Sequence, residues 1–166
     1  MRFVDETSIH VKAGDGGHGC IAFLREKFRP HGGPCGGDGG KGGDIIFVSS
    51  NQLSTLQDLS KNHHYKAKRG EHGKGKNCHG KNGDNLIIKV PLGTLVKNSK
   101  TQQLIHDFKK DNESFIVAKG GNGGFGNARF KTRNNVAPEI ANDGAFGEEL
   151  SLDLELKVLA DVGLIG

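Results

Sequence analysis

The sequence has 166 residues and a mass of 17.7 kDa, which is room for one domain with a modest hydrophobic core. No apolar run approaches the ~18–20 residues that cross a bilayer, the first residues lack an apolar signal-peptide core, and the three cysteines form no CxxC pair. We therefore expect neither a membrane-spanning nor a secreted, disulfide-bonded protein, but a cytoplasmic protein with free thiols at Cys20, Cys35 and Cys78. The net charge of +4 is unevenly placed: residues 138–166 hold seven acids and one base, so the first 137 residues carry +10.

Short β-branched or aromatic blocks, bounded by Gly, Asn, Asp or Pro, predict strands. In chain order these blocks are 9–13, 20–24, 44–50, 85–91, 94–98 and 114–119. Only residues 52–59 give a weak helical pattern. Leucines at every second position from Leu150 to Leu156, followed by Val158, predict a last strand with one face in the core. The fold class is mainly β, and about ten short strands fit a barrel or a sandwich.

Glycine is concentrated in three blocks between these strands. Of the 27 glycines, twelve lie in residues 14–43, five in 70–83 and five in 120–126. Many recur at every third position, and a period of three matches the polyproline II helix, which has three residues per turn and no internal hydrogen bonds. Collagen needs far more proline and longer triplet runs, and a flexible linker would have more serine and less rhythm. We therefore expect several polyproline II segments packed backbone to backbone. The glycines assigned this structural role are Gly33, Gly36, Gly39, Gly42, Gly80, Gly83, Gly120, Gly123 and Gly126.

Several motifs resemble catalytic or metal sites without their required context. GxGxxG occurs three times, but no helical pattern follows it, as a dinucleotide site would require. Lys41 is followed by Gly42, where a phosphate-binding loop needs Ser or Thr. The spacing of His and Cys matches no common zinc site. We therefore assign no catalytic residue and no metal site within these residues.

The glycine blocks and their flanks closely resemble a known family, the N-terminal domain of the bacterial Obg GTPases. The matching stretches are FVDE (3–6), VKAGDGGHGC (11–20), FLREKFRPHGGPCGGDGGKGGD (23–44), GKNG (80–83), IKVPLGT (88–94), VAKGGNGGFGNARFKT (117–132) and LELKVLADVGLIG (154–166). The resemblance implies an Obg fold, in which a β-barrel base carries a bundle of glycine-rich type II helices. It further implies an Obg domain over 1–158 and, over 159–166, the first strand of a GTPase domain.

The resemblance also implies nucleotide chemistry for the full-length protein. Gly166 would be the first glycine of a Walker A loop, in a protein that binds GTP or GDP with Mg²⁺ and hydrolyses GTP slowly. The Lys and the Ser or Thr of that loop are missing from these residues, so we expect neither a cofactor nor GTPase activity here.

The resemblance implies that the protein associates with the large ribosomal subunit and acts in the assembly of that subunit. It also implies a role in stress and growth control and in sensing guanosine tetraphosphate. The resemblance implies that the glycine-rich end contacts ribosomal RNA, and the clustering of basic residues in the glycine-rich blocks agrees with a polyanionic partner. Nothing in the sequence demands more than a monomer. The alternatives are a merely solvated surface and a scaffold that docks a stress-regulatory protein. Phe28, Phe125 and Phe130 are candidates for base stacking or for the core, and we expect the acidic segment 139–149 to be a linker lying across the barrel. The RNA-contact candidates are Lys27, Arg29, His31, Lys41, Lys74, Lys76, Lys81, Arg129, Lys131 and Arg133.

Overall fold

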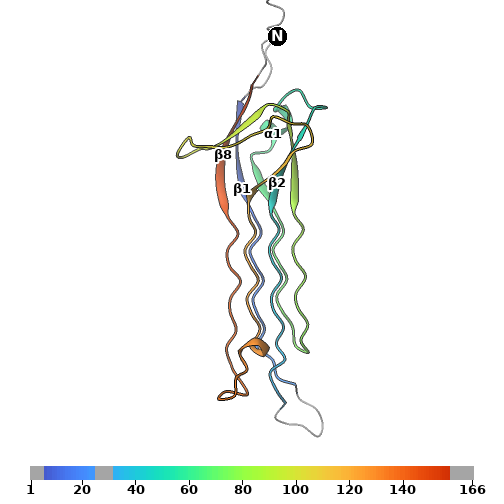
Figure 1. The fold of residues 1–166 in the computed structure, drawn as a ribbon, viewed down its shortest axis with the longest axis vertical. Helices are drawn as coiled ribbons and strands as arrows, with labels where there is room; N and C mark the ends of the chain where they lie inside the picture. The colour runs from blue at the N-terminus through green and yellow to red at the C-terminus, as the bar shows by residue number, and fades with distance from the viewer. Residues whose placement is uncertain (1–5, 25–31, 158–166) are drawn as a thin grey trace, which may run out of the picture.

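A computed structural model describes residues 6–24 and 32–157, and it separates a β-sandwich base from a long glycine-rich rod (Figure 1). In the base lie β1 (Glu6–Lys12), β2 (Ile45–Ser50), α1 (Gln57–Lys61), β3 (His64–Lys66), β4 (Leu86–Pro91), β5 (Thr94–Asn98), β6 (Leu104–Asp107), β7 (Ser114–Ala118) and β8 (Glu149–Leu156). The 3-10 helix η1 (Asn127–Phe130) lies at the far end of the rod.

The strands form two open sheets. One has the order β3-β1-β8-β5-β6 and the other the order β4-β2-β7. The long central strand β8 pairs antiparallel with both β1 and β5, and β2 pairs parallel with β4. The predicted barrel is therefore wrong, and the sandwich alternative describes the base. A barrel needs one continuous ladder, whereas here β3 and β6 are edge strands of only three and four residues.

The two sheets share one apolar core. Every second residue of β1 and β8 points into this core, and β2 and β4 cover it from the other sheet. Phe47 and Phe108 are fully buried, with ring centroids 6.4 Å apart. Gly93 has a left-handed backbone (φ 94°), which lets the chain turn from β4 in one sheet to β5 in the other within two residues.

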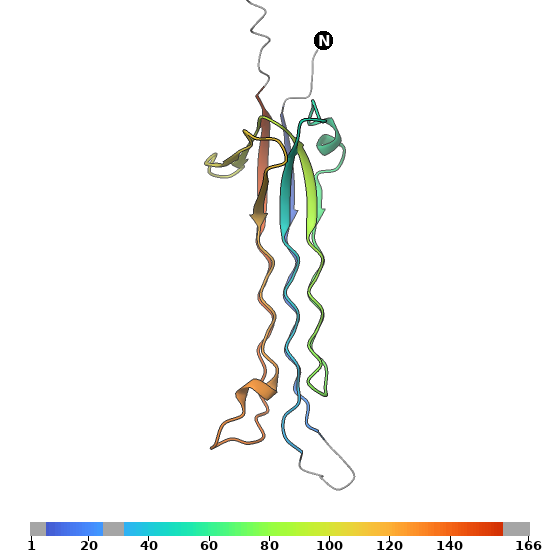
Figure 2. The ribbon, with the colours of Figure 1, turned by 45° about the vertical axis from the view of Figure 1, so that its right-hand side comes forward.

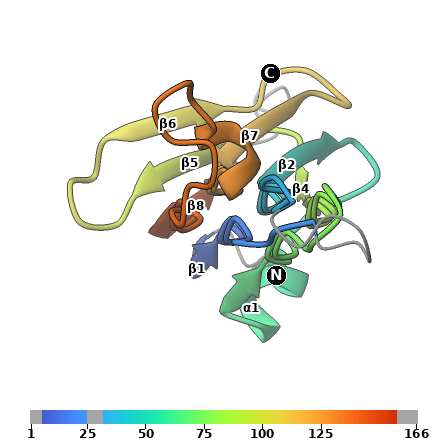
Figure 3. The same cartoon turned by 90° about the horizontal axis from the view of Figure 1, so that it is seen from below.

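We call residues 13–24, 33–44, 67–85 and 119–148 the rod. These segments leave the strands in the same direction and run side by side (Figures 1 and 2). Viewed end-on, they are small triangular coils (Figure 3). The residues predicted as a strand at 20–24 belong to the rod instead, and only Phe23 makes an isolated bridge, to Pro34. The segment 139–149 is not a linker over the base, because residues 142–148 form part of the rod.

Most other predicted elements are present. Strands β1, β2, β4, β5, β7 and β8 overlap the predicted blocks, and the helical pattern at 52–59 corresponds to α1, shifted toward the C-terminus. The short strands β3 and β6 and the helix η1 were not predicted. None of the helices within the described ranges is long and apolar enough to span a membrane.

Candidate nucleic-acid interface on the rod

The backbone of the rod is hydrogen bonded from segment to segment with a period of three. In residues 13–20, every third amide donates to residues 37–43, and the amides one position earlier donate to residues 142–148. Successive residues of the triplet thus hydrogen bond to different neighbouring segments, and the buried amides find acceptors although no sheet is formed. The donor–acceptor pairs are Gly14–Gly43 (2.8 Å), Gly17–Gly40 (2.9 Å), Cys20–Gly37 (3.0 Å), Ala13–Glu148 (2.9 Å), Gly16–Ala145 (2.8 Å) and Gly19–Asn142 (2.9 Å).

Glycine is required in the rod because the backbones are in contact. A Cβ built on Gly39 would lie 1.9 Å from the carbonyl oxygen of Gly17, and one on Gly123 would lie 1.8 Å from that of Gly39. The same overlap, at 1.8–2.1 Å from a carbonyl oxygen, holds for Gly36, Gly42, Gly80, Gly83, Gly120 and Gly126. Gly33 departs from this pattern, since its Cβ would meet only the Lys131 Nζ at 3.9 Å.

Side chains accept the amides that face away from neighbouring backbones. The N–H groups of Asp38, Lys41 and Asp44 donate to His79 Nδ1 (2.9 Å), Asn82 Oδ1 (2.9 Å) and Asn85 Oδ1 (2.8 Å). These acceptors are themselves three residues apart, so the triplet rhythm also governs polar side chains. A backbone N–H can only donate, so His79 Nδ1 must carry no proton.

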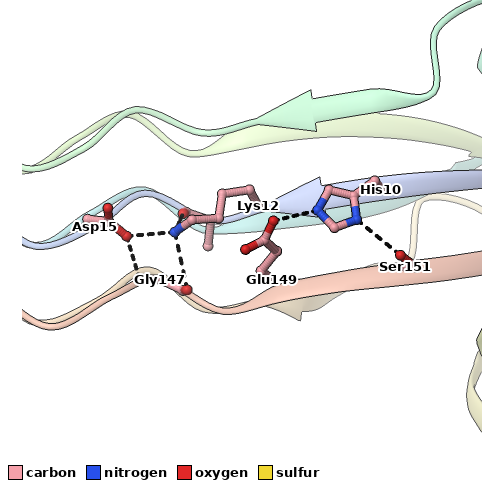
Figure 4. A network of polar contacts seen from close by, with 7 residues as sticks. His10, Lys12, Asp15, Gly147, Glu149 and Ser151 are labelled. Atoms are coloured by element: carbon pink, nitrogen blue, oxygen red, sulfur yellow. Dashed lines mark hydrogen bonds and ion pairs between the residues drawn. The ribbon is translucent and has the colours of Figure 1, made fainter. Parts of the chain in front are cut away.

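Aspartates bind further amides where the rod meets the sandwich. Figure 4 shows Asp15 between Lys12 Nζ (2.6 Å) and the amide of Gly147 (2.9 Å), beside the His10–Glu149 contact of 2.6 Å. The hydrogen bonds from Lys12 and Gly147 lower the pKa of Asp15. Burial raises the pKa of Asp44, but the hydrogen bonds from Lys41 and the Gly120 amide outweigh burial and lower it.

At the far end of the rod, Asn127 connects three chain segments. Its Oδ1 accepts the amide of Gly36 (2.8 Å), and its Nδ2 donates to the carbonyls of Ala22 (3.1 Å) and Pro138 (3.1 Å). Asn127 is fully buried. We call residues 20–24, 33–36 and 127–140 the tip. It holds three predicted contact candidates, Arg129, Lys131 and Arg133, but the role of Asn127 was not predicted.

The predicted contact candidates divide into three groups. Lys27, Arg29, His31 and Phe28 lie outside the described residues, as does Gly166. Two candidates are held by acids of the rod: Lys41 Nζ lies 2.7 Å from Asp44, and Arg129 Nε lies 2.6 Å from Asp38. Exposed candidates with no acidic partner in the part of the chain that the structure describes are Lys74, Lys76, Lys81, Lys131 and Arg133.

Two aromatic side chains, Phe125 and Phe130, lie beside the candidate cation Arg129. Arg129 lies over the Phe125 ring, 4.6 Å from its centroid, and Phe130 lies 6.5 Å from Phe125. Phe125 is 47% exposed, so one part of its ring faces solvent. Near the tip, Lys76 and Asn77 both have left-handed backbones (φ 60° and 57°), which form the tight turn between Lys74 and Cys78.

Two features of this surface were missed in the sequence. The histidines that accept rod amides could have been noticed, since His79 stands three residues before Asn82. No sequence signal could have shown that Asn127 contacts Gly36, 91 residues away. Among the described residues, no group of three or more His, Cys, Asp or Glu is placed to hold a metal ion.

Comparisons with known proteins indicate one family. Residues 4–158 match the family model described as GTP1/OBG. The chain is 58% identical over 164 residues to the protein named GTPase Obg of Sulfurihydrogenibium sp. (strain YO3AOP1), covering 99% of this chain and 47% of that protein. It is 57% identical over 164 residues to GTPase Obg of Anoxybacillus flavithermus, covering 99% and 38%, and 56% identical over 165 residues to GTPase Obg of Aquifex aeolicus, covering 99% and 48%. The chain thus spans about half the length, or less, of these curated relatives.

Proposed function

Since the chain belongs to the GTP1/OBG family, we propose that it is the ribosome-contacting domain of a GTP-binding protein, with its rod directed at the RNA of the large subunit. Obg-type proteins, which the sequence resembles, act in assembly of that subunit. The sandwich would then hold the rod segments together at one end, and the rod would extend into the RNA. The polyproline II conformation expected from the glycine rhythm belongs to the same proposal; the triplet pattern of hydrogen bonds supports it.

The observation that carries this proposal is the set of unpaired cations at one end of a narrow rod. Lys131 and Arg133 lie on the tip, and Lys74 and Lys76 lie in the turn at the same end (Figure 1). Lys81 lies farther along the rod, where its carbonyl accepts the Glu71 amide. Glycine leaves the rod with few side chains on its flanks, so a thin backbone can enter a confined RNA channel. Lysine and arginine side chains then meet phosphates, and the half-exposed Phe125 offers a face for a base.

The test is binding to purified large subunits as a function of salt. Phosphate contacts release counterions, so affinity should fall steeply with salt. Arg133→Gln and Lys131→Gln should each lower the slope of log affinity against log salt by about 0.7–0.9. Lys100→Gln, in the exposed turn between β5 and β6, is the matched control and should leave the slope unchanged. Salt-independent binding, or an equal effect of Lys100→Gln, would contradict the proposal.

We further propose that nucleotide hydrolysis belongs to the full-length protein. GTP or GDP and Mg²⁺ would bind a loop beginning at Gly166, with residues 159–166 as the first strand of the GTPase domain and 1–158 as the Obg domain. The 166 residues contain no Gly-Lys-Ser or Gly-Lys-Thr step to complete such a loop. The chain described here should therefore release no phosphate from GTP, whereas the full-length protein should; turnover by this chain alone would refute the assignment.

A second function, docking of a regulatory protein, is favoured by exposed apolar side chains. Phe146 is 86% exposed on the rod, and Val136 and Ile140 are 60% and 56% exposed on the tip. Such side chains suit a protein partner better than RNA phosphates. In the cytoplasmic monomer that we propose, a stress-regulatory protein would then compete with ribosomes for the tip. Ile140→Ser, on the tip, should weaken only protein binding, and equal weakening of ribosome binding would remove this candidate.

A further inference from the structure

A basic hollow lies where the rod joins the sandwich, away from the tip. It has a volume of about 550 Å³ and is lined by Lys12, Ala13, Gly14, Asp15, Lys66, Ala67, Lys68 and Arg69. This volume falls within the roughly 300–1,000 Å³ typical of small-molecule sites. The lining carries four bases and one acid, which gives it a formal charge of +3.

The lining of the hollow includes small residues in backbone contact. The amide of Ala67 donates to the carbonyl of Lys12 (3.0 Å), and that of Gly70 donates to the carbonyl of Asp15 (2.8 Å). A Cβ on Gly14 would lie 1.9 Å from the carbonyl oxygen of Lys68, so this position cannot carry a side chain. Glycine and alanine thus line the hollow together with four long basic side chains.

The only acid in the lining is already engaged. Asp15 Oδ1 lies 2.6 Å from Lys12 Nζ and accepts the Gly147 amide at 2.9 Å (Figure 4). Lys12 Nζ also donates to the carbonyls of Ala13 (3.1 Å) and Gly147 (3.3 Å), so these two charges satisfy one another. Three bases of the lining remain: Lys66, Lys68 and Arg69.

These three bases lack strong partners. Lys68 faces Asp84 at 3.7 Å, but both side chains are more than three-quarters exposed, and such pairs contribute little. Lys66 has no acidic partner within residues 6–24 and 32–157.

Arg69 is the decisive residue. Its guanidinium lies 3.3 Å from His72 Nε2. The His18 amide donates to His72 Nδ1 at 2.9 Å, so the neutral ring carries its proton on Nε2. Two donors then face each other, and the Arg69–His72 contact is not a hydrogen bond. No acid forms an ion pair with the Arg69 guanidinium in the part of the chain that the structure describes, and Arg69 lines the cationic hollow.

We propose that this hollow binds the oligophosphate group of a small anion, a di- or triphosphate, with Arg69 as the bidentate donor and Lys66 and Lys68 as flanking charges. Guanidinium geometry matches two phosphate oxygens, and ammonium groups add point charges around them. The site is separate from the tip cations, so a small phosphate ligand and the ribosome would occupy different parts of the chain.

The test is a titration of the isotope-labelled chain with sodium tripolyphosphate at constant ionic strength, followed by amide NMR. We expect saturable shifts at Gly14, Ala67, Lys68 and Arg69. Arg69→Gln and Lys66→Gln should each weaken binding about tenfold, since each removes a charged donor to the phosphate oxygens. Lys100→Gln should change it less than twofold, and unchanged thermal unfolding would show that the variants fold.

A parallel titration with adenosine triphosphate distinguishes a site for the phosphates alone from a site for a whole nucleotide. Equal affinity for both probes would confine recognition to the phosphates, and tighter binding of the nucleotide would add contacts to its nucleoside; either result supports the site. Shifts that do not saturate, shifts centred on the tip, or equal weakening by Lys100→Gln would overturn it.

Discussion

The sandwich and the rod are built from one chain but are stabilised by different parts of it. In the sandwich, side chains such as Phe47 and Leu152 are fully buried, and the backbone pairs in ordinary ladders. In the rod there is almost no side-chain core, and backbone hydrogen bonds run between neighbours in steps of three. A sandwich of this kind is damaged by making residues smaller, whereas the rod is damaged by making them larger.

The largest effect is expected for a side chain added inside the rod. In Gly39→Glu the new Cβ would lie 1.9 Å from the Gly17 carbonyl oxygen, and the contact is with backbone, which cannot move alone. The rod should lose more than about 4–5 kcal/mol of stability, because strain of this kind belongs to the exceptional class of substitutions. Limited proteolysis and hydrogen exchange should show open rod segments and a protected sandwich. Gly83→Glu should behave in the same way.

Gly33→Ala is the matched control for that experiment. Its Cβ meets only the flexible end of Lys131, at 3.9 Å. We expect a change within about 0.5 kcal/mol and unaltered protease resistance. If the rod opened equally in Gly33→Ala, or stayed closed in Gly39→Glu, close backbone contact would not be what holds it.

Phe47→Ala tests the other half of the comparison. Phe47 is fully buried and faces Phe108 across the core, so its removal leaves a cavity. The free energy of unfolding should fall by about 3–5 kcal/mol. Because the rod segments start from the strands, hydrogen exchange should speed up in both parts. Loss of protection in the sandwich alone would show that the rod holds itself together.

Asn127→Ala should give an intermediate effect confined to the tip. The substitution leaves the Gly36 amide without its acceptor in a buried place, at a cost of about 1–3 kcal/mol. Faster exchange of that amide, with unchanged exchange in the sandwich, is the expected result. Asn122→Ala, an exposed asparagine of the same rod, is the control and should change neither. Equal effects of the two would mean that Asn127 does not organise the tip.

Acid should produce the smallest and most graded effect. The pKa of Asp15 and of Asp44 is lowered in the folded chain below the ordinary value of 3.8. Their stabilisation is therefore complete above pH 3.8 and is lost as pH falls through the lower folded values. Asp44→Asn should remove about 1 kcal/mol at neutral pH and flatten the acid limb of a stability curve. An unchanged acid limb would show that Asp44 contributes nothing to the junction.

The sequence predicted the local character of both parts. Alternation with a period of two located β8, β-branched and aromatic blocks between turn residues located most other strands, and a glycine period of three marked the rod. Both rhythms are properties of neighbouring residues, so no distant contact is needed to recognise them. The resemblance to the Obg family, carried by the same glycine blocks, agreed with the family match over residues 4–158.

Only the tertiary structure decided how these pieces meet. It left the sheets open, took residues 20–24 into the rod, added residues 142–148 as a further rod segment, and joined Arg129 to Asp38 and Asn127 to Gly36 across 91 residues. Glycine that permits close approach does not specify which backbone approaches. The pairing of rod segments depends on where each strand of the sandwich ends. Long-range packing sets these positions, and no local sequence pattern encodes them.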